Sequence, residues 1–316
     1  MIDPKFTIFT STYNRKHTID RVWQSLINQT SKNFEWIVID NGSVDGIKPV
    51  LEGYKAKANF EVRTFYQENQ GRYMAFNRAV DLAKGELFVP ADSDDWFEPN
   101  TIARFEEIWA KYKSDDVSGI TVLCKYEDDE IVGEKFPHEG IADYKNIVYK
   151  NKIGGEKWGC IRVDLLKKYR FPTHFDVKDF PAMYLWAQIG FNYKLVVMNE
   201  PLRIYYQDAG NQYTHQRDES YANMDMKNFY TLWEINYIFR EVGKYVSLRD
   251  YLQKFVYLWI TSFKSKKSVS YVISKLESTK SKIIALALLV PSYLINLFKL
   301  KLNFLKPKKY KYQIEQ

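Results

Sequence analysis

The chain has 316 residues, 46% of them hydrophobic and 27% charged, which suffices for one large domain with an appended piece and is unlike a disordered protein. Its net charge of +7 is uneven, because residues 264–316 carry 12 lysines and 2 acids while the rest has a net charge of −3, so the body of the protein is not expected to bind nucleic acid. Two cysteines, Cys124 and Cys160, exclude a disulfide framework or a zinc site, and Met1–Pro4 leads straight into a predicted strand, so we expect a cytoplasmic protein without a signal peptide.

The first hundred residues alternate between short apolar runs and helical patterns. Strands are predicted at 6–9, 34–39, 60–65 and 87–89. Helices are predicted over 18–29 and over the run that Gly71 opens and Gly85 stops. This alternation indicates an α/β fold with a parallel sheet covered by helices.

Polar loops follow the first two predicted strands. The first loop contains Thr12, Tyr13, Asn14 and Arg15, and the second contains Asp40, Asn41, Gly42 and Ser43. Because ligands bind outside the carboxyl ends of parallel strands, we expect these loops to be neighbours at a ligand site. The alternative is that Asn41-Gly42 is only a turn and that Asp40 caps it.

An acidic cluster, Asp92-Ser93-Asp94-Asp95, ends the fourth predicted strand. Three carboxylates on four residues repel one another unless a cation lies among them. Oxygen ligands of this kind suit Mg²⁺ or Mn²⁺. The alternative is a solvated turn in which Ser93 or Asp94 caps the next helix.

Three other nucleotide or metal motifs are absent from the sequence. Neither a Gly-x-Gly-x-x-Gly run after the first strand nor a Gly-x4-Gly-Lys-Ser/Thr run occurs, which argues against dinucleotide dehydrogenases and P-loop NTPases. Residues 96–99, Trp-Phe-Glu-Pro, stand where a calcium loop needs its glycine turn.

The remaining body alternates further. A helix is predicted over 99–112, strands over 119–124, 131–136 and 193–198, and a short helix over 183–189. The glycine-rich segment 154–162 indicates backbone lying close to a ligand or to another strand, or else a tight loop. Residues 220–263 are helical in pattern and rich in aromatic residues, most of them expected in a core.

Taken together, these motifs resemble family 2 glycosyltransferases over about the first 210 residues. The matching residues are Asn69, Gly71, Ala75, Asn77, Ala83, Gly85, Asp92 to Asp95, the loop Thr12 to Arg15, and Asn199-Glu200-Pro201-Leu202. The resemblance implies a GT-A fold, in which a mostly parallel sheet is flanked by helices. It implies a catalytic domain at 1–215, divided into a nucleotide-binding half at 1–98 and an acceptor half at 99–215, with a helical extension at 216–263 and a tail at 264–316.

The resemblance also implies an activity and a set of ligands. A sugar would move, with inversion, from a nucleoside diphosphate sugar, expected to be a UDP-sugar, to an acceptor hydroxyl. Nucleotide contacts would come from Thr12, Tyr13, Asn14, Arg15, Asp40, Asn41, Gly71, Asn77, Asp92 and Ser93. Mn²⁺ or Mg²⁺ would be held chiefly by Asp94, with Asp92 and Asp95 helping and His215 as a further contact, although a lone loop histidine is more often only solvated.

Inverting transfer also needs a carboxylate that takes the acceptor's proton. The family places it where a loop enters a helix, four residues before Trp186, and this sequence has Ala182 there. Asp179 is therefore our candidate base and Asp176 the second, unless either only caps the helix. Ala182 also leaves open the alternative that this is a protein of the same fold that binds nucleotide sugars but does not catalyse transfer. A nucleotidyltransferase is a third hypothesis, but this sequence lacks the glycine-rich basic loop that such an enzyme needs near its N-terminus.

Residues 283–298 form an apolar segment interrupted by Pro291 and shorter than the roughly 20 residues that span a bilayer. Lysines flank it on both sides, which predicts a peripheral helix on the anionic inner face of the cell membrane through 283–311. The alternative is a helix packed on the body or on a second subunit. Family and tail together suggest a glycan or lipid-linked glycan acceptor in surface polysaccharide synthesis, with the oligomeric state open.

Overall fold

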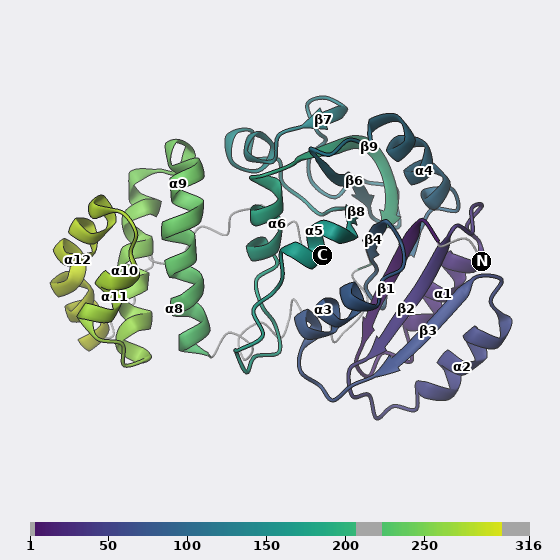
Figure 1. The fold of residues 1–316 in the computed structure, drawn as a ribbon, viewed down its shortest axis with the longest axis horizontal. Coiled ribbons are helices and arrows are strands. Elements are labelled where there is room, and N and C mark those ends of the chain that lie inside the picture. The colour runs from purple at the N-terminus through teal and green to yellow at the C-terminus, as the bar shows by residue number, and fades with distance from the viewer. Residues whose placement is uncertain (1–3, 207–222, 299–316) are drawn as a thin grey trace. The chain divides into compact units, whose positions relative to one another are not determined.

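The computed structural model describes residues 4–206 and 223–298, which divide into two compact units (Figure 1). The first unit contains the described residues up to Thr173 and from Val177 to Tyr206. The second contains His174–Asp176 and the helices from Met224 onward. Each unit is described by itself below.

A nine-stranded sheet forms the centre of the first unit, in the order β3-β2-β1-β4-β8-β6-β9-β5, with β7 paired to β9. The strands are β1 (Phe6–Thr12), β2 (Phe34–Asp40), β3 (Glu61–Tyr66), β4 (Leu87–Pro90), β5 (Trp96–Phe97), β6 (Val117–Lys125), β7 (Gly140–Ala142), β8 (Lys157–Arg162) and β9 (Lys194–Ile204). The first four are parallel, as predicted, whereas β8 runs antiparallel to both of its neighbours and makes the second half of the sheet mixed. The predicted α/β class is confirmed.

Helices cover both faces of this sheet. They are α1 (Ile19–Ile27), α2 (Lys48–Lys57), α3 (Arg72–Leu82), α4 (Thr101–Tyr112), the π-helical turn η1 (Asn146–Lys150), α5 (Val163–Lys168) and α6 (Met183–Gly190). Side chains alternate along β1, so Phe6 and Ile8 join the core shared with α1, α2 and α4, while Phe9 packs on Phe76 of α3. Phe76 in turn packs on Trp186 of α6. The fold therefore has three layers.

Two predicted features of this unit are wrong. Residues 131–136 form no strand, and only a single bridge joins Ile131 to Lys125. The glycine-rich segment supplies strand β8 instead, where a Cβ on Gly159 would lie 1.9 Å from the Ile120 carbonyl oxygen. Gly85 does not end α3, which stops at Leu82; a Cβ on Gly85 would lie 2.5 Å from the Thr7 nitrogen. Both glycines permit close contact with a neighbouring strand.

The second unit is helical in its described part. It comprises α8 (Met224–Trp233), η3 (Glu234–Ile238), α9 (Phe239–Val242), η4 (Gly243–Tyr245), α10 (Leu248–Lys264), α11 (Val269–Lys275) and α12 (Thr279–Leu297). Phe255 and Trp259 of α10 are completely buried in its core, which confirms the expected aromatic packing there. Serine or asparagine side chains cap the starts of α8, α10, α11 and α12.

Candidate functional site

The loops after β1 and β2 are joined into one rim. Parallel pairing aligns Thr12 with Asp40, and the Asn41 N–H donates to the Thr12 carbonyl at 2.8 Å. Asn14 adopts a left-handed backbone with φ of 53°, its N–H donates to Ser43 Oγ at 2.9 Å, and its Oδ1 accepts from the Val44 N–H at 2.9 Å. The predicted proximity of the two loops is therefore present, and the Tyr13 side chain is half-exposed beside them.

Asp40 and Asn41 both hold this rim in shape. Asp40 is buried, and its Oδ1 accepts from the Ser43 N–H at 2.9 Å, which is the capping role of the alternative hypothesis. Asn41 Oδ1 accepts from Gln67 Nε2 at 2.8 Å, and its Nδ2 donates to Asn69 Oδ1 at 3.3 Å. Asn41 thus links the loop after β2 to the loop after β3, while the second carboxylate oxygen of Asp40 has no hydrogen bond among the described residues.

Gly71 and Asn77, predicted to contact nucleotide, both have structural contacts within the first unit. Gly71 has φ of 93°, and a Cβ there would lie 2.4 Å from the Lys178 carbonyl oxygen. Asn77 is buried on α3; its Nδ2 donates to the Phe171 carbonyl at 2.9 Å, and its Oδ1 accepts from the Phe171 N–H at 3.3 Å. Both residues therefore fix the segment 171–178 against α3, and we leave them out of the nucleotide site.

The acidic cluster is a tight turn at the carboxyl end of β4. The Asp92 N–H donates to Asp95 Oδ2 at 2.8 Å, and the Asp95 N–H donates to the Asp92 carbonyl at 3.1 Å, with Ser93 buried inside the turn. Asp95 faces inward, where its Oδ1 lies 2.9 Å from Nε of Arg203 on β9. Asp95 is therefore an internal anchor, in contrast to its predicted place among the metal ligands.

Arg203 is the centre of a buried charge network that the sequence analysis missed. Its guanidinium also lies 3.3 Å from Glu156 Oε1, and its side chain is only 2% exposed. Burial raises the pKa of Asp95 well above its ordinary value, against the opposing charge of Arg203. Burial would lower the pKa of Arg203, yet the neighbouring acidic groups, chiefly Asp95, keep it well above its ordinary value. Its only signal in the sequence is a lone arginine in an apolar strand.

Asp94 has different surroundings. Its Oδ2 lies 3.7 Å from Arg15 Nη1 of the loop after β1, which brings the acidic turn and the first loop together. Burial, and next the negative charge of Asp92, raise the pKa of Asp94. Asp92 itself is exposed. Two carboxylates in such proximity are energetically unfavourable and can be relieved by a cation.

A divalent metal fits this pair, but only with help from a ligand. Within residues 4–206 and 223–298, no group of three or more His, Cys, Asp or Glu side chains is placed to hold a metal ion. Mg²⁺ is commonly bound by one or two carboxylates together with substrate phosphates. Asp94 and Asp92 match that donor set. His215 lies outside the described residues.

Of the two candidate bases, the structure brings only Asp179 to this part of the first unit. Asp179 is buried, and its Oδ1 lies 3.4 Å from Nε of Arg72, the first residue of α3. The Arg72 N–H donates to the Lys178 carbonyl at 3.2 Å, which fixes the loop. Asp176 is exposed and belongs to the second unit. Arg72 is a further residue that the sequence analysis missed.

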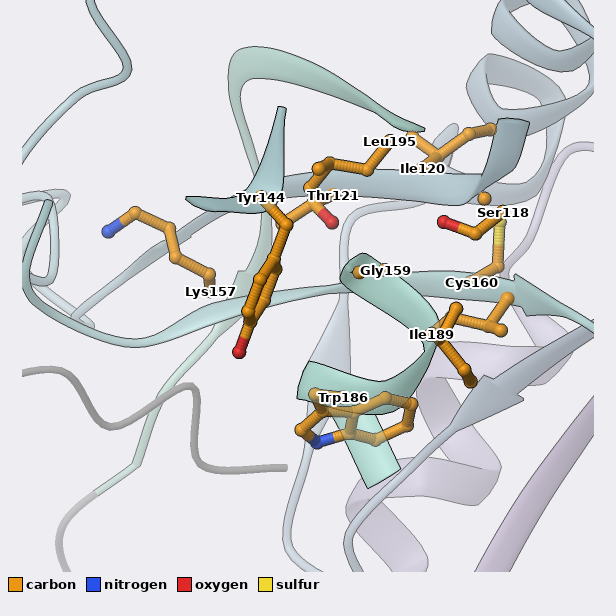
Figure 2. A pocket seen from close by; sticks show the side chains of 13 residues that line it. Ser118, Ile120, Thr121, Tyr144, Lys157, Gly159, Cys160, Trp186, Ile189 and Leu195 are labelled. Carbon is orange, nitrogen blue, oxygen red and sulfur yellow. The ribbon is translucent and has the colours of Figure 1, made fainter. Parts of the chain in front are cut away.

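A cavity of about 50 Å³ lies elsewhere in the first unit, between α6 and strands β6 and β8 (Figure 2). Figure 2 shows Tyr144, Gly159, Cys160 and Trp186 around it. None of the predicted site residues lines it. The cavity is a packing gap under α6, apart from the carboxyl-end loops.

Comparison with known proteins agrees with this geometry. The sequence model of the family described as Glycosyl transferase family 2 matches residues 7–170, just over half of the chain. The chain belongs to glycosyl transferase family 2. The matched region contains the joined loops, α3 and the acidic turn, and it ends before Asp179 and Arg203.

Relatives and a solved structure extend the family 2 match. EpsH of Bacillus subtilis (strain 168), named as a glycosyltransferase, is 27% identical over 190 residues, covering 56% of this chain and 53% of EpsH. The GalNAc(5)-diNAcBac-PP-undecaprenol beta-1,3-glucosyltransferase of Campylobacter jejuni is 24% identical over 208 residues, 64% of each chain. The chain thus spans less than two thirds of either relative. Residues 1–349 of S. aureus TarS in complex with UDP-GlcNAc match with a TM-score of 0.59 at 19% identity, over 91% of this chain and 81% of that one. That likeness confirms the GT-A fold.

Proposed function

We propose that this family 2 protein is an inverting glycosyltransferase that moves a sugar from a UDP-sugar to an acceptor hydroxyl. The observation that carries the proposal is the position of the Asp94 carboxylate, where the first loop meets the acidic turn. Asp94 lies 3.7 Å from the positive charge of Arg15 and is also close to the negative charge of Asp92. A nucleoside diphosphate with a divalent cation matches this mixture of carboxylates and guanidinium in charge.

The rim formed by the first two loops would hold the nucleoside. Tyr13 offers a half-exposed ring on which a base can stack, and the second oxygen of Asp40 can accept from a uracil N–H. Asn14, Asn41 and Thr12 act from behind by fixing the two loops to each other. Because Asp40 is itself held by the Ser43 N–H, the base edge would meet a carboxylate of fixed orientation.

Asp94 and Asp92 would hold Mn²⁺ or Mg²⁺, which, when bound, neutralises the diphosphate as it leaves. Arg15 would add a second positive charge beside the same phosphates. Asp95 and Arg203 would take no direct part and would keep the turn in place. With the leaving group stabilised in this way, the transfer requires no strong general acid.

Asp179 would serve as the general base. The acceptor oxygen attacks the anomeric carbon from the side opposite the diphosphate; as the new C–O bond forms, the old one breaks, its electron pair leaves with the diphosphate, and the acceptor's proton passes to Asp179. Arg72, 3.4 Å away, would orient that carboxylate. Asp179 would thus take the role of the carboxylate that the family has at the position of Ala182, three residues later in the sequence.

The acceptor class and location are also proposals. TarS is described in complex with UDP-GlcNAc, and the Campylobacter relative is named for an undecaprenol-linked acceptor, which supports a UDP-sugar donor and a glycan or lipid-linked glycan acceptor in surface polysaccharide synthesis. Such an acceptor would be met at the cytoplasmic face of the membrane.

Binding and turnover of UDP-sugars in paired variants test these roles. Calorimetry with Mn²⁺ should show UDP binding to the wild type and to Asp115→Asn, an exposed acid outside the site, with strong loss in Asp94→Asn. Equal binding by Asp94→Asn would refute its metal role. Asp179→Asn should bind UDP normally and lose transfer. The second candidate is a protein that binds nucleotide sugars without catalysing transfer, and Ala182 is the observation in its favour. A wild type that binds UDP with Mn²⁺ but turns over no donor with any acceptor would support it.

A further inference from the structure

The last described helix, α12, has an unusual distribution of side chains. Its outward side carries large apolar residues between 45% and 65% exposed, namely Ile283, Leu286, Val290, Tyr293, Leu294, Leu297 and, just beyond its end, Phe298. At 100° per residue these positions, with the exposed Ala287 and Pro291, fall on one continuous side of the helix. We call this set of exposed residues the apolar face.

The opposite side of α12 is docked on α10, and its most buried positions are small residues. The fully buried positions on that side include Ser281, Ala285 and Ser292. Trp259 Nε1 of α10 donates to the Ala285 carbonyl at 2.7 Å, and at the border of the apolar face the ring of Tyr293 packs edge-on against Phe263 of α10, with 5.7 Å between ring centroids. A helix on a water-soluble domain normally turns its larger apolar residues inward. Here the three buried positions are serine or alanine, the larger Ile284, Leu288 and Leu289 are only partly buried against the core, and the outward side is apolar from Ile283 onward.

The charges in α12 and in the sequence that follows it indicate what covers the apolar face. Residues 278–314 contain eight lysines and no acid. Two of these lysines, Lys280 and Lys282, stand in the first turn, and the other six follow the helix in the sequence. A second copy of this chain would bring like charges together, whereas anionic lipid headgroups would neutralise them.

We propose that the apolar face of α12 is a docking surface for an anionic membrane, with the helix lying in the plane of the interface. By length and composition α12 is the one helix of the described ranges that could cross a membrane, and 17% of its most apolar window is buried. Crossing would break its contacts with α10, which carries Arg249, Asp250 and Lys254. A helix held in this way inserts one side only. The proposal concerns the second unit and is independent of the donor and acceptor chemistry.

The test is co-sedimentation of the full chain with vesicles, without donor or acceptor. Wild-type protein should pellet with vesicles of equal parts phosphatidylglycerol and phosphatidylcholine and stay in solution with phosphatidylcholine alone. Binding should weaken in high salt, because the lysine contribution is screened. Leu286→Glu with Val290→Glu should abolish sedimentation, and Lys280→Gln with Lys282→Gln should weaken it by about tenfold or more.

Leu248→Glu is the matched control, because Leu248 is an apolar residue of the same unit, 72% exposed and outside α12. It should sediment like the wild type. The substituted positions are exposed, except Lys282, which is partly buried, so circular dichroism should show unchanged folding. The salt and lipid dependence of the wild type tests the proposal without any variant. Wild-type protein that ignores anionic vesicles, or a Leu286→Glu/Val290→Glu protein that still sediments, would overturn the proposal. So would a wild-type dimer, seen by light scattering, that this variant converts to monomer.

Discussion

Replacing Arg203 by methionine isolates the role of the buried charge network. The change removes the guanidinium that lies 2.9 Å from Asp95 and 3.3 Å from Glu156, and these side chains are 5% and 7% exposed. Removing one partner of a buried ion pair costs roughly 3–5 kcal/mol, because the other charge stays buried and uncompensated. For a unit of about this size, each kcal/mol shifts Tm by roughly 2–4 °C, so we expect a fall of roughly 6–20 °C.

Thermal unfolding followed by circular dichroism measures this loss, with Lys84→Met as the control. Lys84 pairs with Glu61 at the surface of the same unit, where an ion pair contributes roughly 0–1 kcal/mol. The deficit of Arg203→Met should shrink as the pH falls, since burial already raises the pKa of Asp95 and protonation removes the buried charge. A Tm within about 2 °C of the wild type at neutral pH, near the effect of the surface control, would refute the reasoning.

Two further predictions follow from buried polar groups. Asn77→Ala should lower the free energy of unfolding by about 1–3 kcal/mol, because both polar backbone groups of Phe171 lose their partner, and it should leave UDP affinity unchanged. A variant that loses UDP affinity while its Tm stays near that of the wild type would instead support a nucleotide contact. Lys157→Met should raise Tm at pH 7, since burial lowers the pKa of Lys157 and its Nζ donates to the Gly154 carbonyl alone among the described groups. The wild type gains stability as the pH rises through that lowered pKa toward 10.5, so the advantage of methionine should shrink there, and a constant advantage would contradict this account.

The parallel half of the sheet could be predicted because local signals suffice for it. Each strand there is a short apolar run followed by a polar loop, and parallel pairing alone brings Thr12 next to Asp40. The mixed half could not be predicted in the same way. Residues 131–136 have a strand-like composition, yet β8 occupies one edge of β6 from Gly119 to Leu123 and β9 occupies the other, so only the end of β6 is left for the single bridge between Lys125 and Ile131.

Within the candidate site, the sequence predicts which residues gather but not which way they face. Asp92, Asp94 and Asp95 cannot be told apart by residue type. Asp95 faces inward because it pairs with Arg203, which lies 108 positions later in the sequence. Asn77 belongs to the family pattern for a structural reason, a pair of bonds to the Phe171 backbone 94 positions away. Such distant partners leave no periodic signal in the sequence.

The measurement that tests the central claim most directly is the release of nucleoside diphosphate from a panel of nucleotide sugars, with and without Mn²⁺. Water can take the acceptor's place, so the acceptor need not be known. We predict metal-dependent release from one donor, a UDP-sugar, by the wild type and by Asp115→Asn, with no release by Asp94→Ala. Two results would contradict the assignment of the acidic turn. One is a wild type that shows no release and no binding of any donor, and the other is full release by Asp94→Ala.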